Sequence, residues 1–425
     1  MKEAHQLAEH FFRHQAGRLV ATLTRILGPR HLDLVEDVVQ AAFVQALRSW
    51  ATRGVPSDPA GWLFCVAKNA ALDTLRRERR WTATLSTKLA SEFSEPDAQA
   101  ADDLTRIDRL PELEDDALRM LCLCCHPALS LESQIAVALK MACGFSTHEI
   151  ARALLSSAAT IQRRISRAKE SLRNESMIEL DAETFRDQLP AVLHVVYLIF
   201  NEGYNSSGVE SMIRQDLCEE ALRLGGAITR NATGNVPRAR ALMALMSFQA
   251  ARFDARLQAS GDLVLLPDQD RSRWNRARIH QGVRWLAAAA EGNELSAYHL
   301  EAGIAAEHSL AQDFAATNWD RITRLYDLLV RIQPTPVHRL NRAIAIAYAH
   351  GPQSGLNALA TINWSEVPAT YYLFDAALGE LHRRAGHFEQ AEKHLRRAIA
   401  LSPSPPEQRL LQARLVAARN SDAAG

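Results

Sequence analysis

The sequence lacks the features that mark exported, membrane-spanning and disulfide-stabilised proteins. Its first residues, MKEAHQLAEHFFRHQAGRLV, carry charges throughout and contain no apolar core, which argues against a signal peptide. No stretch has the roughly 20 consecutive apolar residues that cross a bilayer. Six cysteines in 425 residues do not form a disulfide framework. We therefore expect a cytoplasmic protein with reduced thiols.

The sequence also has few glycines and prolines, and its formal net charge is zero. With 19 Gly and 16 Pro, the chain keeps long uninterrupted stretches, and their apolar residues recur at helical rather than strand spacing. We expect an all-α fold. The 49 basic residues are balanced by 49 acidic ones, so a nucleic-acid function cannot rest on global charge. The length allows two to four domains.

The charge is unevenly distributed along the chain. Residues 60–80 hold five Lys or Arg against two acidic residues, and residues 150–175 hold six against two. Between them, residues 91–116 hold ten acidic residues against two Arg. Two basic islands therefore flank an acidic stretch.

The stretch from Phe145 to Leu172 predicts two short helices joined by a tight turn. Ser146 and Glu149 have the spacing of a capping box, and Ser157 can cap the second helix. The second helix has an apolar side, Ile161, Ile165, Ala168 and Leu172, and a small, polar and basic side, Ala159, Gln162, Arg163, Ser166, Arg167 and Glu170. The second side suits base edges and phosphates. A solvated surface hairpin is the alternative, because helix-turn-helix look-alikes are common.

Three further helices are predicted upstream, over residues 5–27, 32–50 and 61–80. Gly28 and Pro29 end the first helix. Residues 51–59 are predicted as a loop from their Gly, Pro and Ser content. In the second helix we expect Leu47 on the apolar face and Glu36 in solvent.

The third of these helices carries a mixed polar stripe, formed by Trp62, Asn69, Asp73, Arg76 and Arg80. Bases stack on aromatic rings and Arg neutralises phosphate, so the stripe matches single-stranded or melted nucleic acid. The opposite side is predicted to be buried and consists of Leu63, Val66, Ala67, Ala70 and Thr74. A core Trp beside a solvated basic helix end is the alternative.

Residues 81–111 resemble a linker, and residues 112–143 predict two helices. The run LCLCCHP places Cys122, Cys124, Cys125 and His126 in an apolar helix. Neighbouring residues on a helix point about 100° apart, and no second ligand cluster complements the run, so we expect buried packing. Metal binding or redox sensing is the alternative. We expect no cofactor and no metal.

Three motifs in this order resemble an extracytoplasmic-function (ECF) sigma factor of bacterial RNA polymerase. They are DLVEDVVQAAFVQALRSW (Asp33–Trp50), PAGWLFCVAKNAALDTLRRERR (Pro59–Arg80) and GFSTHEIARALLSSAATIQRRISRAKESLR (Gly144–Arg173). The resemblance covers about residues 5–175 and is more specific than the helix-turn-helix alone. It implies two helical domains, region two and region four, joined by a flexible linker. It also implies a non-enzymatic protein whose partners are core RNA polymerase and promoter DNA, with no membrane contact.

The resemblance assigns roles by position. For core polymerase it implies Asp33, Asp37, Gln40, Phe43 and Trp50. For the −10 element it implies Trp62, Lys68, Asn69, Asp73, Arg76 and Arg77, to which the polar stripe adds Arg80, with the loop before them placed to hold a flipped-out base. For the −35 element it implies Ala159, Thr160, Gln162, Arg163, Ser166, Arg167 and Lys169. Leu155 stands where the family usually has a turn Gly, and Gln162-Arg163 replaces a more usual pair, so the −35 sequence stays open.

The chain continues far beyond this resemblance. Helices are predicted over residues 184–201, 214–229, 237–259, 272–290 and 296–307, with a helix break in FNEGYNSS (Phe200–Ser207) and a non-helical stretch over residues 260–270. The residues Leu378, Gly379, Gly386, Phe388, Ala391, Leu395, Ala398 and Pro403 fit the tetratricopeptide (TPR) pattern. Residues 340–359 look like a degenerate preceding unit. A helical solenoid is therefore predicted.

A sigma region with this extension resembles the ECF subgroup that has a TPR-containing C-terminal domain. FNEGY and LLPDQDRSRW (Leu265–Trp274) look like motifs of that extension. The second motif offers an Asp–Arg pair and a helix start near Asp270. Neither motif indicates a particular chemistry, and an enzyme site there is the less favoured interpretation.

The predicted domains are region two (1–80), an acidic linker (81–111), region four (112–178) and a helical extension (179–425) with TPR-like repeats near 334–403. The linker is expected to follow the basic RNA-exit path of the polymerase. The extension is expected to regulate activity, by packing on the sigma domains or by binding a partner. Two other functions stay open: a helix-turn-helix regulator with a TPR sensor, and an interaction scaffold whose sigma-like half is degenerate.

Overall fold

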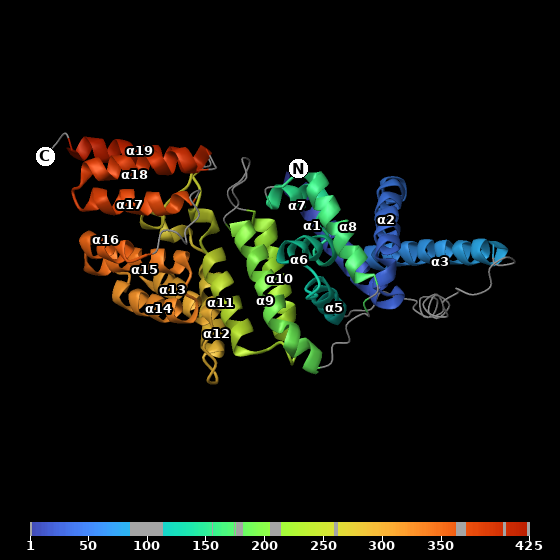
Figure 1. Ribbon diagram of the computed structural model, residues 1–425. Coiled ribbons are helices and arrows are strands. Elements are labelled where there is room, and N and C mark those ends of the chain that lie inside the picture. The colour runs from blue at the N-terminus through green and yellow to red at the C-terminus, as the bar shows by residue number, and fades with distance from the viewer. Residues whose placement is uncertain are drawn as a thin grey trace. The chain divides into compact units, whose positions relative to one another are not determined.

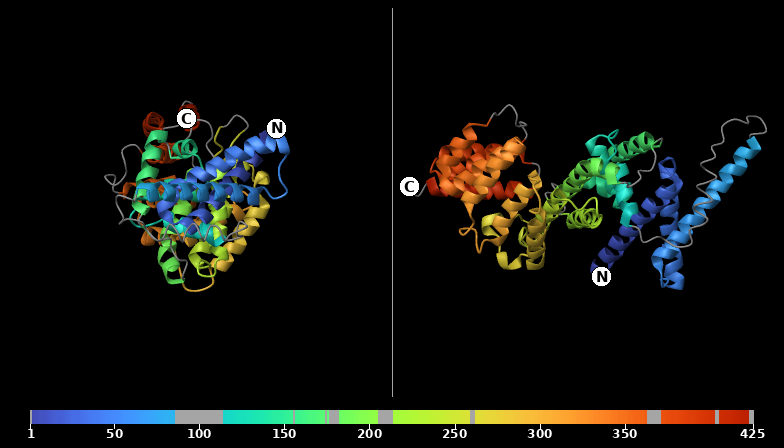
Figure 2. Two further views of the ribbon diagram at one scale, coloured as in Figure 1. Left: turned by 90° about the vertical axis from the view of Figure 1, so that its right-hand side faces the viewer. Right: turned by 90° about the horizontal axis from the view of Figure 1, so that it is seen from below.

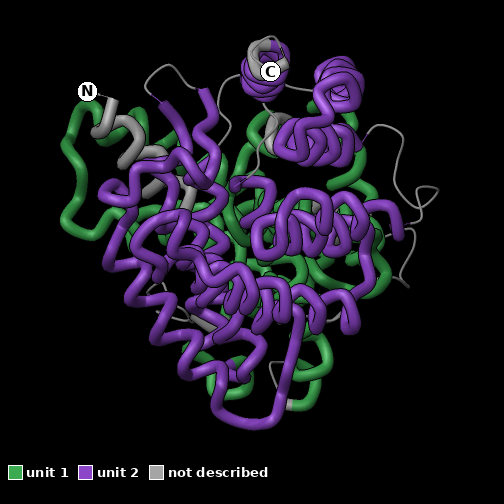
Figure 3. Tube along the Cα trace, turned by 90° about the vertical axis from the view of Figure 1, so that its left-hand side faces the viewer, with its two compact units in different colours: residues 1–199, 230–234 green, residues 200–229, 235–425 purple. Residues whose placement is uncertain are grey.

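The computed structural model of the chain is built of helices (Figure 1). It describes residues 2–85, 114–154, 156–173, 175, 182–204, 214–258, 262–362, 371–402 and 405–422. Extended pairing in these ranges is limited to one antiparallel bridge between Leu257 and Leu263, which confirms the all-α prediction. The chain divides into two compact units, residues 1–199 with 230–234 and residues 200–229 with 235–425 (Figure 3).

The helices of the first unit follow the predicted order. They are α1 (Lys2–Leu27), the short η1 (Pro29–His31), α2 (Leu32–Arg53), α3 (Pro59–Leu85), α5 (Glu114–Cys124), α6 (Leu131–Val137), the π-helical turn η2 (Ala138–Ala142), α7 (Thr147–Ala153), α8 (Ala158–Leu172) and most of α9 (Ala182–Tyr204). No helix in the described ranges is both long and apolar enough to cross a membrane.

The boundaries of α2 and α3 differ from the prediction. Residues 51–53 are helical rather than part of a loop, and α2 ends at Gly54, whose φ of 79° is easily adopted without a side chain. Helix α3 begins at Pro59, and the Asp58 carboxylate accepts a hydrogen bond from the Gly61 N–H at 2.9 Å. It continues to Leu85 and takes in the start of the predicted linker. The rest of that linker lies outside the described residues.

Helix α1 packs against both α5 and η2, which belong to the predicted region four. Gly17 makes the approach close, because a Cβ added there would lie 2.4 Å from the Ala142 carbonyl oxygen. The Asp116 carboxylate is 2% exposed, accepts a hydrogen bond from Thr22 Oγ1 at 3.0 Å and lies 2.7 Å from Arg25 Nε. The two predicted sigma regions therefore share one core within the first unit.

The second unit is a succession of helices that mostly contact their neighbours in the chain (Figure 2). Its elements are most of α10 (Gln215–Arg230), then α11 (Pro237–Ala250), η3 (Phe253–Ala255), η4 (Leu266–Asp268), η5 (Arg271–Arg273), α12 (Arg276–Ala289), α13 (Ala297–Leu310), α14 (Trp319–Ile332), α15 (Pro336–His350), α16 (Pro352–Ala360), α17 (Tyr372–Arg384), α18 (Phe388–Leu401) and α19 (Pro405–Asp422).

Successive hydrophobic clusters join α13 through α19, as expected for a solenoid. One cluster lies between α13, α14 and α15, the next between α15, α16 and α17, and the third between α17, α18 and α19. Gly379 lets α17 and α18 approach closely, because a Cβ added there would lie 2.7 Å from Leu395 Cγ. Gly379, one of the residues that fit the predicted TPR pattern, therefore lies where the two helices cross.

Three predicted boundaries in the second half are wrong. Helix α9 continues through FNEGY to Tyr204, where the Tyr204 ring stacks on Phe200 with centroids 5.8 Å apart. Helix α11 ends at Ala250 rather than at residue 259, and the Ala251 carbonyl accepts a hydrogen bond from the Asn275 N–H at 2.8 Å. Helix α12 begins only at Arg276, because Asn275 is its cap, whereas Asp270 caps the short η5.

Candidate nucleic-acid interface

Helix α8 has the geometry that the sequence predicts for a recognition helix. The Ser157 hydroxyl accepts a hydrogen bond from the Thr160 N–H at 3.1 Å, and the capping box of Ser146 and Glu149 starts α7. The four apolar residues of α8 are buried against the unit, and the six polar or small residues of the opposite side are exposed. The predicted turn residue Leu155 lies outside the described residues.

The exposed side of α8 is held in place by contacts to the rest of the hairpin. Thr147 Oγ1 donates to Gln162 Oε1 at 3.3 Å, which links the start of α7 to the exposed face of α8. Arg163 Nε donates to the Ala159 carbonyl oxygen at 3.4 Å. Arg167 and Ser166 are exposed one turn further on. The surface offers amide, guanidinium and hydroxyl groups, which are the types of group that contact base edges and phosphates in other proteins.

Helix α3 presents most of its predicted polar stripe to solvent. Asn69, Asp73 and Arg76 are exposed, and so is Arg77, while Lys68 is half-buried. The side chain of Arg80 lies outside the described residues. The buried side is rotated from the prediction: it consists of Leu63, Phe64, Ala67, Ala71, Leu72 and Leu75, whereas Val66, Ala70 and Thr74 are half-buried.

Trp62 is half-buried and packs on Trp50 of α2, with ring centroids 5.5 Å apart. One tryptophan was predicted to bind polymerase and the other to contact DNA. Their contact joins the end of α2 to the start of α3, on either side of residues 54–58. The loop that was predicted to hold a flipped-out base is therefore fixed at both ends.

Helix α2 exposes a stripe of residues at helical spacing. Asp33, Asp37 and Gln40 are exposed as predicted, and Val44 and Leu47 continue the same side at 48% and 63% exposed. The prediction that Leu47 is buried is wrong. Phe43 is half-buried beside this stripe. Sequence spacing alone did not separate Leu47 from the core residues, because the apolar arc of α2 is wider than the surface that α1 and α3 cover.

Two lysines converge on α2 from the predicted region four. Lys169 Nζ lies 2.8 Å from Asp33 Oδ1 and also bonds Glu36, and Lys140 Nζ lies 2.6 Å from Glu36 Oε1. We call Asp33, Glu36, Lys140 and Lys169 the Glu36 ion cluster. The Lys169 side chain is 11% exposed, so in this arrangement it does not join the exposed polar side of α8, where it was predicted to contact the −35 element.

The electrostatics of the Glu36 ion cluster are those of a partly buried ion network. Burial alone would raise the pKa of Glu36, but Lys140 and Lys169 together hold it below its usual value. Burial alone would lower the pKa of Lys169, but its hydrogen bonds to Asp33 and Glu36 raise it. The expectation that Glu36 is solvent-exposed is wrong, because Lys140 reaches it from η2, a contact with no local sequence signal.

The cysteine run lies in the core of the first unit. Cys122, Cys124 and Cys125 are at most 2% exposed, as the packing interpretation predicts. Burial raises the pKa of the Cys122 thiol to about 12, and it raises the pKa values of the other two as well. Metal ligation needs thiolates, which this environment disfavours. His126 pairs with Glu175 at 3.5 Å, and no metal-binding group occurs among the described residues.

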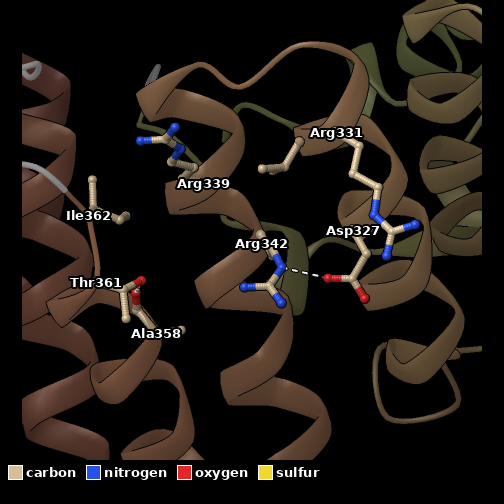
Figure 4. Close-up of a pocket in the computed structure, with 8 residues that line it drawn as sticks. Asp327, Arg331, Arg339, Arg342, Ala358, Thr361 and Ile362 are labelled. Carbon is tan, nitrogen blue, oxygen red and sulfur yellow. Dashed lines mark hydrogen bonds and ion pairs between the residues drawn. The ribbon is translucent and has the colours of Figure 1, made fainter.

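A cavity of about 350 Å³ lies between α14, α15 and α16 of the second unit (Figure 4). Arg331, Arg339 and Arg342 line it together with Asp327, which lies 2.6 Å from Arg342 Nε. Ala358, Thr361 and Ile362 form the facing wall, as Figure 4 shows. Three guanidinium groups against one carboxylate make this cavity positively charged. No local sequence pattern reveals this cavity, because its lining comes from three helices and the residues after them.

Comparison with family models supports both halves of the chain. Sigma-70 region 2 matches residues 11–81, and Sigma-70 region 4 matches residues 119–172. A tetratricopeptide repeat matches residues 375–415, which places the repeat on α17, α18 and the first part of α19. A family of unknown function (DUF6596) matches residues 188–290, which include both FNEGY and the DQDRSRW motif.

Two relatives differ in how much of the chain they cover. An uncharacterized protein of Rhizobium meliloti (strain 1021) is 37% identical over 380 residues, which is 89% of this chain and 88% of the relative. The RNA polymerase sigma factor CarQ of Myxococcus xanthus is 31% identical over 183 residues, which is 42% of this chain and 93% of the relative. With both sigma regions matched in order and nearly all of a sigma factor aligned, the chain belongs to the family of RNA polymerase sigma factors, with a C-terminal extension that contains a TPR repeat.

Proposed function

We propose that this sigma factor binds core RNA polymerase through the exposed stripe of α2. The stripe combines two carboxylates and an amide with the exposed apolar residues Val44 and Leu47. Large apolar residues on an otherwise polar helix face favour a protein partner. The family resemblance also assigns Phe43 and Trp50 to polymerase binding. Both residues belong to α2 and are half-buried beside the exposed stripe.

Promoter DNA is proposed to meet two helices. The exposed side of α8, from Ala159 to Arg167, would read the −35 element, and the polar stripe of α3 would contact the −10 element. The observation that carries this proposal is the clean division of α8 into four buried apolar residues and an exposed polar side. A helix so divided is supported from behind and leaves its polar side free for the major groove. The chain would then act where polymerase and chromosome are, in the cytoplasm, without an enzymatic reaction of its own.

In-vitro transcription with purified core polymerase tests this function. A sigma factor is expected to start promoter-specific transcripts with no other sigma factor present. A helix-turn-helix regulator would bind DNA but give no transcript in that assay, and a degenerate scaffold would bind core without opening the promoter. Either result would overturn the proposal.

We also propose that the extension regulates the sigma regions. Support comes from two facts: most of the extension, residues 200–229 and 235–425, forms a compact unit of its own, and the sigma factor CarQ aligns with 42% of this chain while 93% of CarQ is covered. A sigma factor of that family therefore does not need such a unit for its basic role. The proposed domain division remains 1–80, 81–111, 112–178 and 179–425, with the linker directed along the RNA-exit path.

Two truncations separate regulation from folding. One variant ends after residue 180, before α9, and the other ends after residue 212, so that it keeps α9 with the first unit. If the extension regulates, the longer variant is expected to change promoter output while core binding and helicity persist. Output equal to that of the full chain from both variants would contradict the regulatory role.

A further inference from the structure

The DQDRSRW motif builds a cationic cluster that the sigma function does not use. Trp274, the last residue of the motif, is 2% exposed. Two guanidinium groups lie against its ring: Arg271 Cζ is 4.5 Å from the ring centroid, and Arg252 Cζ is 5.5 Å away. Arg252 comes from the chain just after α11, so two segments of the second unit converge on one indole.

Hydrogen bonds hold both arginines in place. Arg271 Nη1 donates to the His308 carbonyl oxygen at 2.6 Å and to the Ala311 carbonyl oxygen at 2.8 Å, both at the end of α13. Arg252 Nε donates to Gln269 Oε1 at 3.1 Å. All of these acceptors are neutral. In the part of the chain that the structure describes, neither Arg252 nor Arg271 forms an ion pair with a carboxylate.

Three polar atoms in this cluster are buried without a hydrogen-bond partner in the described structure. They are Arg271 Nη2, Trp274 Nε1 and His308 Nδ1. Arg271 connects the three residues, because its guanidinium lies over Trp274 and bonds the main chain of His308. Buried polar atoms without a partner are rare in folded proteins, and a group of them indicates a site for a water or an ion.

The charge of the cluster decides whether a water molecule or an ion fits the site better. Burial, Arg252 and Arg271 lower the pKa of His308 to about 3, so its ring is neutral at neutral pH and two positive charges remain. Burial and the neighbouring Arg256 also lower the pKa of Arg252, and the Asp313 carboxylate offsets only part of the charge at Arg271. A water molecule would satisfy donors but would leave the charge in place. An anion does both.

We propose that Arg252, Arg271 and Trp274 form a binding site for a phosphate-type oxyanion, with His308 beside it. A doubly charged oxyanion balances two guanidinium groups, and its several oxygens can accept from Arg271 Nη2 and Trp274 Nε1 together. Arg252, Arg271 and His308 each keep part of their surface in solvent, while the three unpartnered atoms are buried, so phosphate binding requires these side chains to shift. The extension would then carry a ligand site separate from the promoter and polymerase surfaces.

Inorganic phosphate is the probe, and the full chain is the sample. Binding is measured by titration calorimetry and by the midpoint of thermal unfolding, at fixed ionic strength, against acetate and chloride. We expect saturable phosphate binding and an increase in the unfolding midpoint. Trp274→Phe keeps an aromatic ring under the two guanidinium groups but removes the Nε1 donor together with part of the indole, and it should weaken phosphate binding by about tenfold.

The cavity arginine supplies the matched control, because Arg331→Gln removes a guanidinium from the other cationic site of this unit (Figure 4). It should leave phosphate affinity unchanged. If Trp274→Phe does not fold, Arg271→Lys keeps the charge, lacks Nη2 and should give the same loss. The proposal is overturned by equal responses to phosphate, acetate and chloride, by no saturable binding at millimolar phosphate, or by a loss in Arg331→Gln alone.

Discussion

Glu36 is held between two lysines that come from different helices, so its ionisation is tied to the packing of α2 against η2 and α8. Its pKa is below the ordinary 4.5 because Lys140 and Lys169 outweigh the effect of burial. A depressed carboxyl pKa stabilises the fold above the unfolded-state pKa, and this contribution is lost as the pH falls through the folded-state pKa. The contacts of the first unit should therefore weaken in acid below pH 4.5.

Glu36→Gln is expected to remove this pH dependence and to destabilise the first unit by about 2 kcal/mol at neutral pH, between the values for exposed and buried ion pairs. Urea unfolding between neutral and acidic pH measures both effects. Glu170→Gln is the control, since this glutamate on α8 is 69% exposed and lies 3.5 Å from Arg173, outside the Glu36 ion cluster. Identical pH profiles for the wild type and Glu36→Gln would show that the Glu36 ion cluster does not contribute.

Gly17 is the second residue whose surroundings make a sharp prediction. A methyl group at this position would meet the Ala142 carbonyl oxygen at 2.4 Å, and backbone cannot move aside as a flexible side chain can. Gly17→Ala should therefore destabilise the contact of α1 with η2 by about 1–3 kcal/mol. Hydrogen exchange of peptides from α1 and α5 measures the loss.

Gly303→Ala on α13 is the matched substitution, because its new methyl group would meet only the flexible Leu325 side chain, at 3.3 Å. It should change stability by no more than about 0.5 kcal/mol. Equal exchange rates in both variants would mean that α1 and η2 are not held at this distance.

Local patterns predicted single residues well where burial follows helix periodicity and poorly where distant segments meet. The buried side of α8 was predicted correctly from spacing alone. Glu36 and Leu47 were misplaced, because their environments depend on which neighbours cover α2. A lysine more than one hundred positions away in the chain decides the state of Glu36.

At the scale of elements, caps were easier to predict than helix ends. The capping box of α7 and the serine cap of α8 follow from residue types at fixed spacing. The continuation of α9 to Tyr204 depends instead on ring stacking and on Gly203, where an added Cβ would lie 2.7 Å from the Arg214 carbonyl oxygen. The polar sequence NEGY by itself does not indicate these tertiary contacts.

Single substitutions on the exposed side of α8 test its proposed contact with promoter DNA. Arg163→Ala and Arg167→Ala should each weaken −35 binding, and Arg167→Ala should also reduce the slope of log affinity against log salt by about one, as expected for a lost phosphate contact. Fluorescence anisotropy of the polymerase holoenzyme with promoter DNA over a salt series measures both quantities.

The control for these variants is Arg186→Ala, which removes the same charge from an exposed position on α9. It should leave promoter affinity and salt slope as they are. Should Arg163→Ala and Arg167→Ala behave like Arg186→Ala, the assignment of α8 as the recognition helix is wrong.

At the scale of the whole molecule, the order of domains was predictable and the packing of the two sigma regions was not. The order follows from the motifs along the chain. The TPR pattern is seen in the structure where Gly379 of α17 packs closely on Leu395 of α18. The shared core of α1, α5 and η2 joins residues on opposite sides of the predicted linker, residues 81–111, so no local pattern specifies it.

This packing places the predicted polymerase contact Asp33 against Lys169 of the proposed recognition helix. The proposed contact of Asp33 with core polymerase requires Asp33 to leave Lys169, so we expect the Glu36 ion cluster to oppose core binding. Lys169→Glu replaces attraction to Asp33 and Glu36 by repulsion. It should tighten binding to core polymerase, by up to about 10–30-fold if the full ion-pair energy of about 2 kcal/mol opposes binding.

Core binding without promoter DNA is the measurement, because it separates this effect from any role of Lys169 at the −35 element. Lys393→Glu on α18 makes the same charge change at an exposed position of the second unit and should leave core affinity unaltered. Unchanged or weaker core binding by a folded Lys169→Glu would mean that the contact between α2 and α8 persists on the polymerase. In that case the two helices would reach the promoter as one rigid body, and the −10 and −35 contacts could not be adjusted independently.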